Sequence, residues 1–438
     1  MSDPAGPSPG LSRRRFLKTA AAATGVAVVG GVGGLVGYEL ATGAGSPAPG
    51  SATPSDAAPS THLGEGAAAI VPFRDVHQAG IATPAQERLC FAAFDLTVRD
   101  RSALVALLRA WTAAAELMTR GEPVATPEGE PLAPPEDTGE AVGLRPGRLT
   151  VTVGFGPGLF DDRFGLASRR PAALADIPRF PGDFLEPERN GGDIAIQACA
   201  DDPQLAFHAV RNLARLGRGT VVMRWFQLGF GRTASTSSAQ ATPRNLQGFK
   251  DGTNNIVAED LPLMRDHVWV GDETDQPWMR DGSYVVARRI RMLIETWDRT
   301  SLGEQERVIG RIKASGAPLT GSIERDPADL DAIGPDGAPI IAPDAHVRLA
   351  MPATPTGERI LRRGYSYSDG IHPQTGLLDA GLFFIAYQKD PRTGFVPIQR
   401  RLAGLDSLNE YIRHTGSAVF ACPPGLGADG WWGQTLLG

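Results

Sequence analysis

The sequence predicts an α+β protein built from two similar units, each with the element order β-α-β-β-α-β. Three observations favour this class. Strand-like and helix-like segments alternate in that order through the first half of the chain, and the order repeats with longer insertions in the second half. The chain has 438 residues, 42% of them hydrophobic, which suffices for the core of one large or two medium domains.

The first half has two helical segments among four strand-like ones. Leu104, Leu107, Leu108 and Trp111 recur at helical spacing, with Ser102 as the candidate N-cap. A second helix is expected to open at Asp202-Pro203, because proline is favoured in the first helical turn. The strand-like segments are 89–98, 149–153, 193–199 and 220–228. This order is that of the ferredoxin-like unit, with antiparallel strands and both helices on one face.

The second half follows the same order with more inserted residues. Strand-like segments are expected at 283–294, 359–367, 377–388 and 418–422, and helical ones at 302–312 and from 397 to 402. The sequence therefore predicts two tandem ferredoxin-like units, at 66–240 and 241–438. A Ser- and Thr-rich loop is expected at the junction, at 233–241.

The N-terminus carries an export pattern. Ser12-Arg13-Arg14-Arg15-Phe16-Leu17-Lys18 precedes a weakly apolar stretch at 20–37, and the seven residues resemble the twin-arginine signal S-R-R-x-F-L-K at every position. A membrane anchor is the alternative, but the stretch is short of the roughly 20 apolar residues that a span needs. We expect a signal peptide at 1–45, a disordered Ala/Gly/Ser/Pro linker at 46–65, and export to the periplasm, cell envelope or medium.

Charge and cysteine content exclude several classes. The net charge is −6 and no basic run follows residue 20, so nucleic acid is not expected as a partner. Cys90, Cys199 and Cys422 are odd in number and widely spaced, which predicts small buried groups instead of disulfides or a zinc site. The seven histidines show no HxxxH or HExxH spacing, and the chain has no GxSxG elbow, Walker loop or GxGxxG after a strand.

Three segments carry the remaining chemistry. They are the loop 245–255, which contains Gly248-Phe249-Lys250-Asp251-Gly252, the segment 344–352 around His346, and the segment 360–367 around Arg362. Taken singly, each has an ordinary interpretation: a turn, a solvated histidine and a solvated strand edge.

Together, in this order, the three segments resemble the dye-decolourising peroxidase family, in particular its exported deferrochelatase/peroxidase subgroup. The family motif G-x-x-D-G is present at 248–252. Further similarity covers about residues 70–425, at 77–81, 154–156, 192–193, 297–300, 378–382 and 399–402. The resemblance implies a pair of ferredoxin-like units of the dimeric α/β-barrel type and one haem b per chain.

The resemblance also implies which residues bind the haem iron and which take part in catalysis. His346 matches the histidine that ligates the iron, and Asp379 is the candidate acceptor for its second ring nitrogen, with a surface turn carboxylate as the alternative. Asp251 matches the distal acid/base that shuttles the peroxide proton. Arg362 matches the cation that stabilises the departing hydroxide and contacts a haem propionate. A carboxylate shuttle predicts an acidic pH optimum.

Other residues are expected near the haem or on an electron path. Gly252, Thr253 and Asn254 follow the distal aspartate and are expected to line the haem edge. Met351, Pro352 and Ala353 follow the proximal histidine, where the family often has Asn and Arg, so any contact there is expected from the backbone. Candidates for surface oxidation, with burial in the core as the alternative, are Trp269, Trp278, Trp297, Tyr365 and Tyr367.

The expected function is an exported haem peroxidase that reduces hydrogen peroxide and oxidises phenols, dyes or porphyrinogens. One alternative is an iron-acquisition protein, or deferrochelatase, that releases iron and leaves the porphyrin intact, with an iron-uptake permease as a possible partner. A second alternative is a haem-binding module without catalysis, against which the presence of both Asp251 and Arg362 counts. A homo-oligomer is expected.

Overall fold

The computed structural model describes residues 69–438 except 127–128, 353 and 355–356. The twin-arginine signal expected at 1–45 and the linker expected at 46–65 lie outside these residues. Within the described part, no helix has the length and apolar character needed to cross a membrane.

The first half contributes four strands and two long helices, in the expected order. The strands are β1 (Arg88–Leu96), β2 (Thr150–Phe155), β3 (Ile194–Ala200) and β4 (Val221–Arg232), and the helices are α2 (Arg101–Thr119) and α3 (Pro203–Leu216). Asp202 caps α3 through its side chain, with Pro203 in the first turn, as expected. The cap of α2 is Asp100 and not Ser102, because the Asp100 carboxylate accepts the amides of Ser102 and Ala103.

The second half contributes five strands and shorter helices. The strands are β5 (Ser283–Met292), β6 (Leu361–Arg362), β7 (Tyr365–Ile371), β8 (Leu378–Gln388) and β9 (Ile412–Cys422). The helices are α4 (Leu261–His267), α5 (Ile294–Trp297), α6 (Leu302–Ile309), α7 (His346–Ala350), α8 (Phe395–Leu405) and α9 (Gln434–Leu437). The strand expected at 359–367 is divided into β6 and β7, and the strand expected at 418–422 begins at Ile412. Short 3-10 turns connect several elements: η1 (Pro157–Phe160), η2 (Ala167–Arg169), η3 (Pro187–Arg189), η4 (Pro277–Met279) and η5 (Ser407–Glu410).

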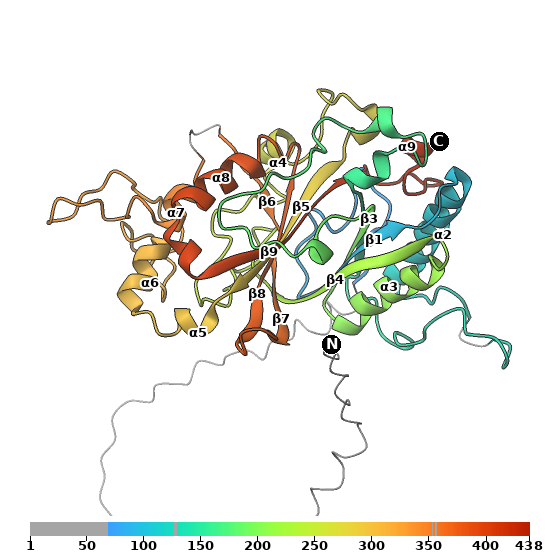
Figure 1. Cartoon of the computed structure of the whole chain (residues 1–438), viewed down its shortest axis with the longest axis horizontal. Coiled ribbons are helices and arrows are strands. Elements are labelled where there is room, and N and C mark those ends of the chain that lie inside the picture. The colour runs from blue at the N-terminus through green and yellow to red at the C-terminus, as the bar shows by residue number, and fades with distance from the viewer. Residues whose placement is uncertain (1–68, 127–128, 353, 355–356) are drawn as a thin grey trace, which may run out of the picture. The chain divides into compact units, whose positions relative to one another are not determined.

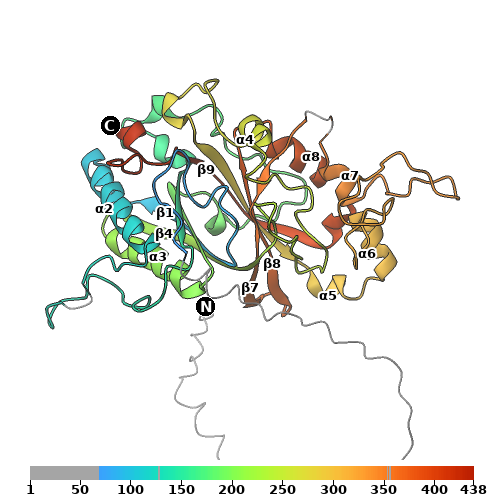
Figure 2. The ribbon, with the colours of Figure 1, turned by 180° about the vertical axis from the view of Figure 1, so that it is seen from behind.

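The strands of both halves form one closed antiparallel sheet (Figures 1 and 2). The first half supplies neighbours in the order β2-β3-β1-β4, and the second half closes the circuit through β7, β8, β5 and β9. The halves join where β2 pairs with β9 and β4 pairs with β7. The α+β class is thus confirmed, with a barrel as its architecture. The finer assignment to two tandem ferredoxin-like units, and the boundary at residue 240, stay predictions.

Strands β2, β3 and β5 are buried on both faces, which explains their nearly continuous apolar sequences, whereas β4 and β7 are partly exposed. In β1, Cys90 and Phe94 pack into the outer core under the helices, whereas Leu89 and Phe91 pack into the barrel lumen. This alternation follows from the two-residue period of a strand. All three cysteines are free and buried, as the sequence predicted.

Candidate active site

His346 is the first residue of α7, and a buried carboxylate fixes its imidazole ring. Its Nδ1 lies 2.6 Å from Oδ2 of Asp406, whose side chain is only 3% exposed. Asp406 caps η5 by accepting the Leu408 amide with its other oxygen, so the carboxylate cannot turn away freely. The His346 side chain remains 35% exposed, which leaves its Nε2 edge available for a ligand.

Long-range contacts hold the short helix α7 in place. Arg401 of α8 donates to the carbonyls of Leu349 and Met351, which lie at the end of α7. Gly310, with φ of 84°, follows α6, and a Cβ there would lie 2.4 Å from a methyl carbon of Val347. A glycine is therefore needed for both the left-handed backbone and the close approach of the two helices.

An ion pair joins the loop after β4 to strand β6. Nη1 of Arg362 lies 2.5 Å from Oδ1 of Asp251. Leu361 packs in the lumen, so the next residue, Arg362, points out of the barrel. The side chains of Asp251 and Arg362 are 14% and 29% exposed. The pair is thus partly exposed and does not lie in the core.

Asn255 connects the same two segments through the backbone. Its amide oxygen accepts the N–H of Arg362 at 2.8 Å, and its amide nitrogen donates to the carbonyls of Arg362 and Ser235, each at 2.8 Å. Gly252, with φ of 95°, has only 3.0 Å between its ideal Cβ position and Cα of Ala234, which makes glycine necessary at this turn. The hydrogen bonds of Asn255 and the turn at Gly252 therefore help to position Asp251 and Arg362, in addition to the ion pair between them.

The two groups belong to one electrostatic site. Burial lowers the pKa of His346, but the charge and hydrogen bond of Asp406 outweigh this effect and raise its pKa above the ordinary value. Asp251 contributes a further increase and Arg362 a decrease, so both lie close enough to His346 to act on its charge. The site thus combines the imidazole of His346, which Asp406 holds, with the nearby ion pair of Asp251 and Arg362.

The residues present fit a haem. An imidazole that is anchored at Nδ1 and free at Nε2 is the usual single axial ligand of a haem iron. In the described ranges, no group of three or more His, Cys, Asp and Glu side chains could hold a metal ion by itself. His346 would hold the iron, and Arg362, whose guanidinium is only partly used by Asp251, would meet a carboxylate of the porphyrin.

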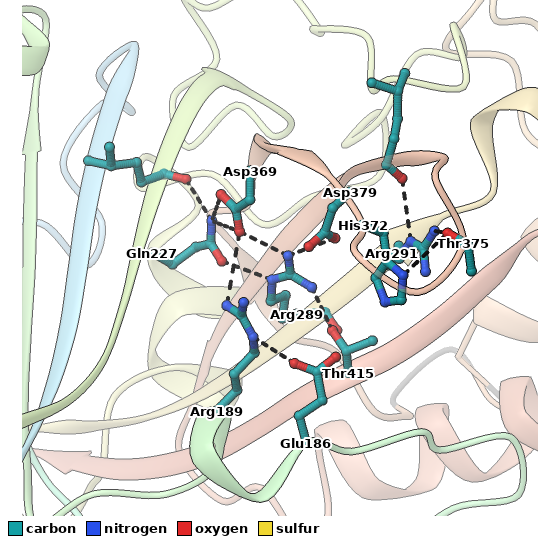
Figure 3. Close-up of polar contacts among 12 residues, drawn as sticks. Glu186, Arg189, Gln227, Arg289, Arg291, Asp369, His372, Thr375, Asp379 and Thr415 are labelled. Carbon is teal, nitrogen blue, oxygen red and sulfur yellow. Dashed lines mark hydrogen bonds and ion pairs between the residues drawn. The ribbon is translucent and has the colours of Figure 1, made fainter. Parts of the chain in front are cut away.

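Asp379 is not the partner of His346, and that prediction is wrong. Asp379 lies on the same face of β8 as Phe383, which faces the lumen, and it pairs with Arg289 of β5 at 2.8 Å. Figure 3 shows both residues within a polar network at one mouth of the barrel. The acceptor of His346 is Asp406, which lies 60 residues along the chain.

The remaining predicted residues have varied surroundings. Thr253 is half-buried and donates to Glu324 at 3.2 Å, whereas Asn254 is exposed. Met351 and Pro352 are half-buried, and Ala353 lies outside the described residues. Of the residues considered for surface oxidation, Trp278, Trp297, Tyr365 and Tyr367 are buried, whereas Trp269 is partly buried and stacks on His77 at 3.7 Å.

Sequence reasoning missed Asp406, Asn255 and Arg401. Asp406 carries a local signal, since an aspartate before Ser407-Leu408 is typical of a helix cap. Nothing in its spacing from His346 indicates the contact. Asn255 lies inside the motif loop but resembles an ordinary turn residue, and the role of Arg401 depends on how α8 packs against α7.

Comparison with known proteins gives matches over most of the chain. Residues 78–231 match the family model described as "Dyp-type peroxidase, N-terminal", and residues 242–427 match "Dyp-type peroxidase, C-terminal". The "Deferrochelatase" of Escherichia coli K12 is 41% identical over 373 residues, covering 84% of this chain and 87% of that protein. A DyP-type peroxidase structure from Streptomyces coelicolor is 39% identical, with a TM-score of 0.78 over 85% of this chain and 98% of that one. One from Cellulomonas bogoriensis is 42% identical, with a TM-score of 0.76 over 85% and 99%.

The fold and the matched proteins thus define a haem peroxidase. The chain belongs to the Dyp-type peroxidase family, and haem is its cofactor.

Proposed function

We propose that this chain is an exported peroxidase that reduces hydrogen peroxide and takes electrons from phenols, dyes or porphyrinogens. The observation that carries the proposal is the Asp251–Arg362 pair, held at 2.5 Å beside an imidazole that Asp406 anchors. A module that only stores haem needs an axial ligand but neither an acid nor a cation next to the open coordination position.

Each residue of the site would have a separate role in the reaction. The haem, when bound, would supply an iron centre that takes up the two oxidising equivalents of hydrogen peroxide and passes them to the donor. His346 donates a hydrogen bond from its Nδ1–H to Asp406, which makes its Nε2 a stronger ligand. Oδ2 of Asp251, which accepts only a 3.2 Å hydrogen bond from Asn245, takes a proton from the entering peroxide and returns it to the departing oxygen. Arg362 stabilises the negative charge on that oxygen.

Iron release from haem is the second candidate function. It is favoured by the name "Deferrochelatase" of a relative that is 41% identical over 84% of this chain. Both functions would use the same pocket, but they differ in product. Peroxidase turnover leaves haem in the protein, whereas iron release leaves a metal-free porphyrin. An iron-uptake permease would be a partner only under the second function.

The test loads the protein with hemin and compares the wild type with His346→Ala and His372→Ala. His372 lies on the β7–β8 hairpin, where its Nδ1 contacts Thr375, and it controls for the loss of an imidazole elsewhere. The Soret band and peroxide-dependent oxidation of a phenol are measured, and the porphyrin is then extracted. We expect both signals in the wild type and in His372→Ala, their loss in His346→Ala, and recovery of intact haem. Recovery of metal-free porphyrin without phenol oxidation would assign iron release instead.

We also propose export by the twin-arginine route, on the strength of residues 12–18. The test is fractionation of cells that express the full chain or its Arg13→Lys/Arg14→Lys variant. We expect the wild type in the exported fraction and the variant in the cytoplasm. An equal distribution of the two chains would contradict the proposal.

A further inference from the structure

The loop that carries Asp251 is held from outside by a single carboxylate, that of Glu324. Glu324 lies between α6 and α7, 71 residues after Thr253. Its Oε1 accepts the Thr253 hydroxyl at 3.2 Å, and its Oε2 pairs with the ammonium group of Lys250. Lys250 directly precedes Asp251, and Thr253 follows it by two residues. One side chain thus contacts the loop on both sides of the proposed acid/base.

The Glu324 carboxylate is charged although it is largely enclosed. Its side chain is 17% exposed. Burial raises the pKa of Glu324, but hydrogen bonds from Lys250, Thr242 and Thr253 outweigh this effect and lower the pKa below its ordinary value. Hydrogen bonds to an ionised group are stronger than those between neutral groups. Glu324 therefore holds its two partners more firmly than a neutral side chain would.

The backbone at Glu324 is itself fixed by the fold. Arg311 is 7% exposed, and its Nη1 donates to the carbonyls of Glu324 at 3.0 Å and of Gly316 at 2.7 Å. Asp326 accepts the amides of the two residues that precede Glu324, at 2.7 and 3.0 Å. The carboxylate is thus presented from an ordered turn.

Two further contacts join the same segment to the loop of Asp251. Arg244 donates to the carbonyls of Lys313 and Ala314, each at 2.7 Å. Gly316 has φ of 79°, and a Cβ there would lie 2.7 Å from Cδ of Lys250. Glycine therefore permits both the left-handed backbone and the close packing of the Lys250 side chain. The segment fits against the loop over several residues, and Glu324 forms its ionic contact.

The side chain of Asp251 needs this support because its own contacts leave one oxygen weakly held. Oδ1 pairs with Arg362, whereas Oδ2 accepts only the Asn245 amide at 3.2 Å. The direction of the side chain therefore depends on the backbone between Lys250 and Thr253. A group that exchanges a proton with a substrate must lie within hydrogen-bond distance of it, and a small displacement slows the reaction strongly.

We propose that Glu324 is a positioning residue for the reaction with peroxide. By holding Lys250 and Thr253, it keeps the Asp251 carboxylate at the place where it exchanges a proton with the substrate. The inference rests on the function proposed above for Asp251, and Glu324 acts through its two partners and not on the substrate. The alternative is an ion pair that contributes to stability alone, as many partly exposed pairs do.

The test compares hemin-loaded wild type with Glu324→Gln, which keeps the shape of the side chain and removes its charge. The control is Glu304→Gln, because Glu304 pairs with Arg307 at 2.8 Å on α6 and is 39% exposed. Four quantities are measured: the rate constant for reaction with peroxide, the KM for a phenol donor, hydrogen–deuterium exchange of residues 245–255, and the unfolding temperature.

We expect Glu324→Gln to lower the peroxide rate constant roughly 3- to 10-fold, as for a displaced reacting group. Residues 245–255 should exchange faster, and the KM for phenol should stay unchanged because oxidation of the donor does not use the proton shuttle. The control should match the wild type in all four measurements.

A second variant, Lys250→Met/Thr253→Val, removes both partners of Glu324 and should lower the peroxide rate constant to a similar extent. Its combination with Glu324→Gln should add little, because the three groups form one contact and their effects are then not additive. Fully additive losses would show that Glu324 does not act through these partners, and would overturn the proposal.

The other outcomes separate this inference from the proposed function. A wild type that does not react with peroxide would overturn the proposed function, and the role of Glu324 with it. A reactive wild type with the same peroxide rate constant in Glu324→Gln would overturn the role of Glu324 alone. A slower reaction accompanied by a raised KM for phenol and a lower unfolding temperature would indicate a general loss of structure, which also contradicts a positioning role.

Discussion

The arginine–aspartate cluster at the candidate haem site and the one at a mouth of the barrel are built differently. Arg289 at the mouth is 4% exposed and is enclosed by partners from several strands (Figure 3). It contacts Gln227, Asp369, Asp379 and Thr415, and its guanidinium lies 4.2 Å from the ring centroid of Tyr367. Arg362 at the haem site is 29% exposed and has one carboxylate partner.

The difference shows how the same pair of residue types serves structure or chemistry. A buried guanidinium whose donors are all used holds strands together, and it has no capacity left for a ligand. A half-exposed guanidinium next to one carboxylate keeps donors free for a developing charge. Asp251 and Asp379 are thus both partners of arginine, and the proposed function gives the exchange of a proton with the substrate to Asp251.

The largest effect is expected from Asp251→Asn. The amide keeps the shape of the side chain but does not accept a proton from peroxide, so the rate constant for reaction with peroxide should fall on the order of 10²- to 10⁴-fold. Stopped-flow absorption of the hemin-loaded protein measures this rate. Asp379→Asn is the matched control and should stay within about twofold of the wild type. Equal losses in the two variants would remove the distinction between the clusters.

Arg289→Met should affect stability and not chemistry. It leaves Asp379 and Asp369 without their shared cation, and removing one partner of a buried ion pair typically costs about 3–5 kcal/mol of unfolding free energy. Denaturant unfolding measures the loss, and the peroxide rate at a temperature where the variant is folded should remain near that of the wild type. A variant as stable as the wild type would show that the mouth cluster is not structural.

Asp406→Asn tests the partner of His346. An amide in place of the carboxylate cannot raise the basicity of the imidazole in the same way, and loss of such a supporting contact typically weakens metal affinity about 10- to 100-fold. Hemin titration followed at the Soret band measures this affinity. Asp379→Asn should leave it unchanged, because Asp379 contacts Arg289. The reverse pattern would restore Asp379 as the proximal acceptor.

The smallest effect is expected from Asn255→Ala. The change removes the hydrogen bonds to both backbone groups of Arg362, so the guanidinium is less well positioned although it is still present. We expect the peroxide rate to fall about tenfold, as for a displaced positioning group, with hemin affinity unchanged. Asn255→Asp keeps the acceptor for the Arg362 amide and should recover part of the rate. An equal loss in hemin affinity would indicate collapse of the pocket instead.

The sequence by itself determined the elements and the chemical groups. Apolar periodicity placed most strands and both long helices within a few residues, although it missed the first half of β9 and the division between β6 and β7. The burial of the cysteines followed from their number and spacing. The motif at 248–252 and the residues His346 and Arg362 were selected because their segments together resemble the family, and their catalytic roles stay predictions. Short helices such as α7, with five residues, have too few turns to show a helical period.

The tertiary structure decided which groups meet. Closure of the barrel depends on the pairs β2–β9 and β5–β8, which join strands far apart in sequence. The choice of Asp406 over Asp379 follows from burial and direction: Asp379 faces the lumen on β8, whereas Asp406 caps a turn beside α7. A hydrogen bond acts over about 3 Å, and no sequence period encodes which of two distant carboxylates is brought to that distance.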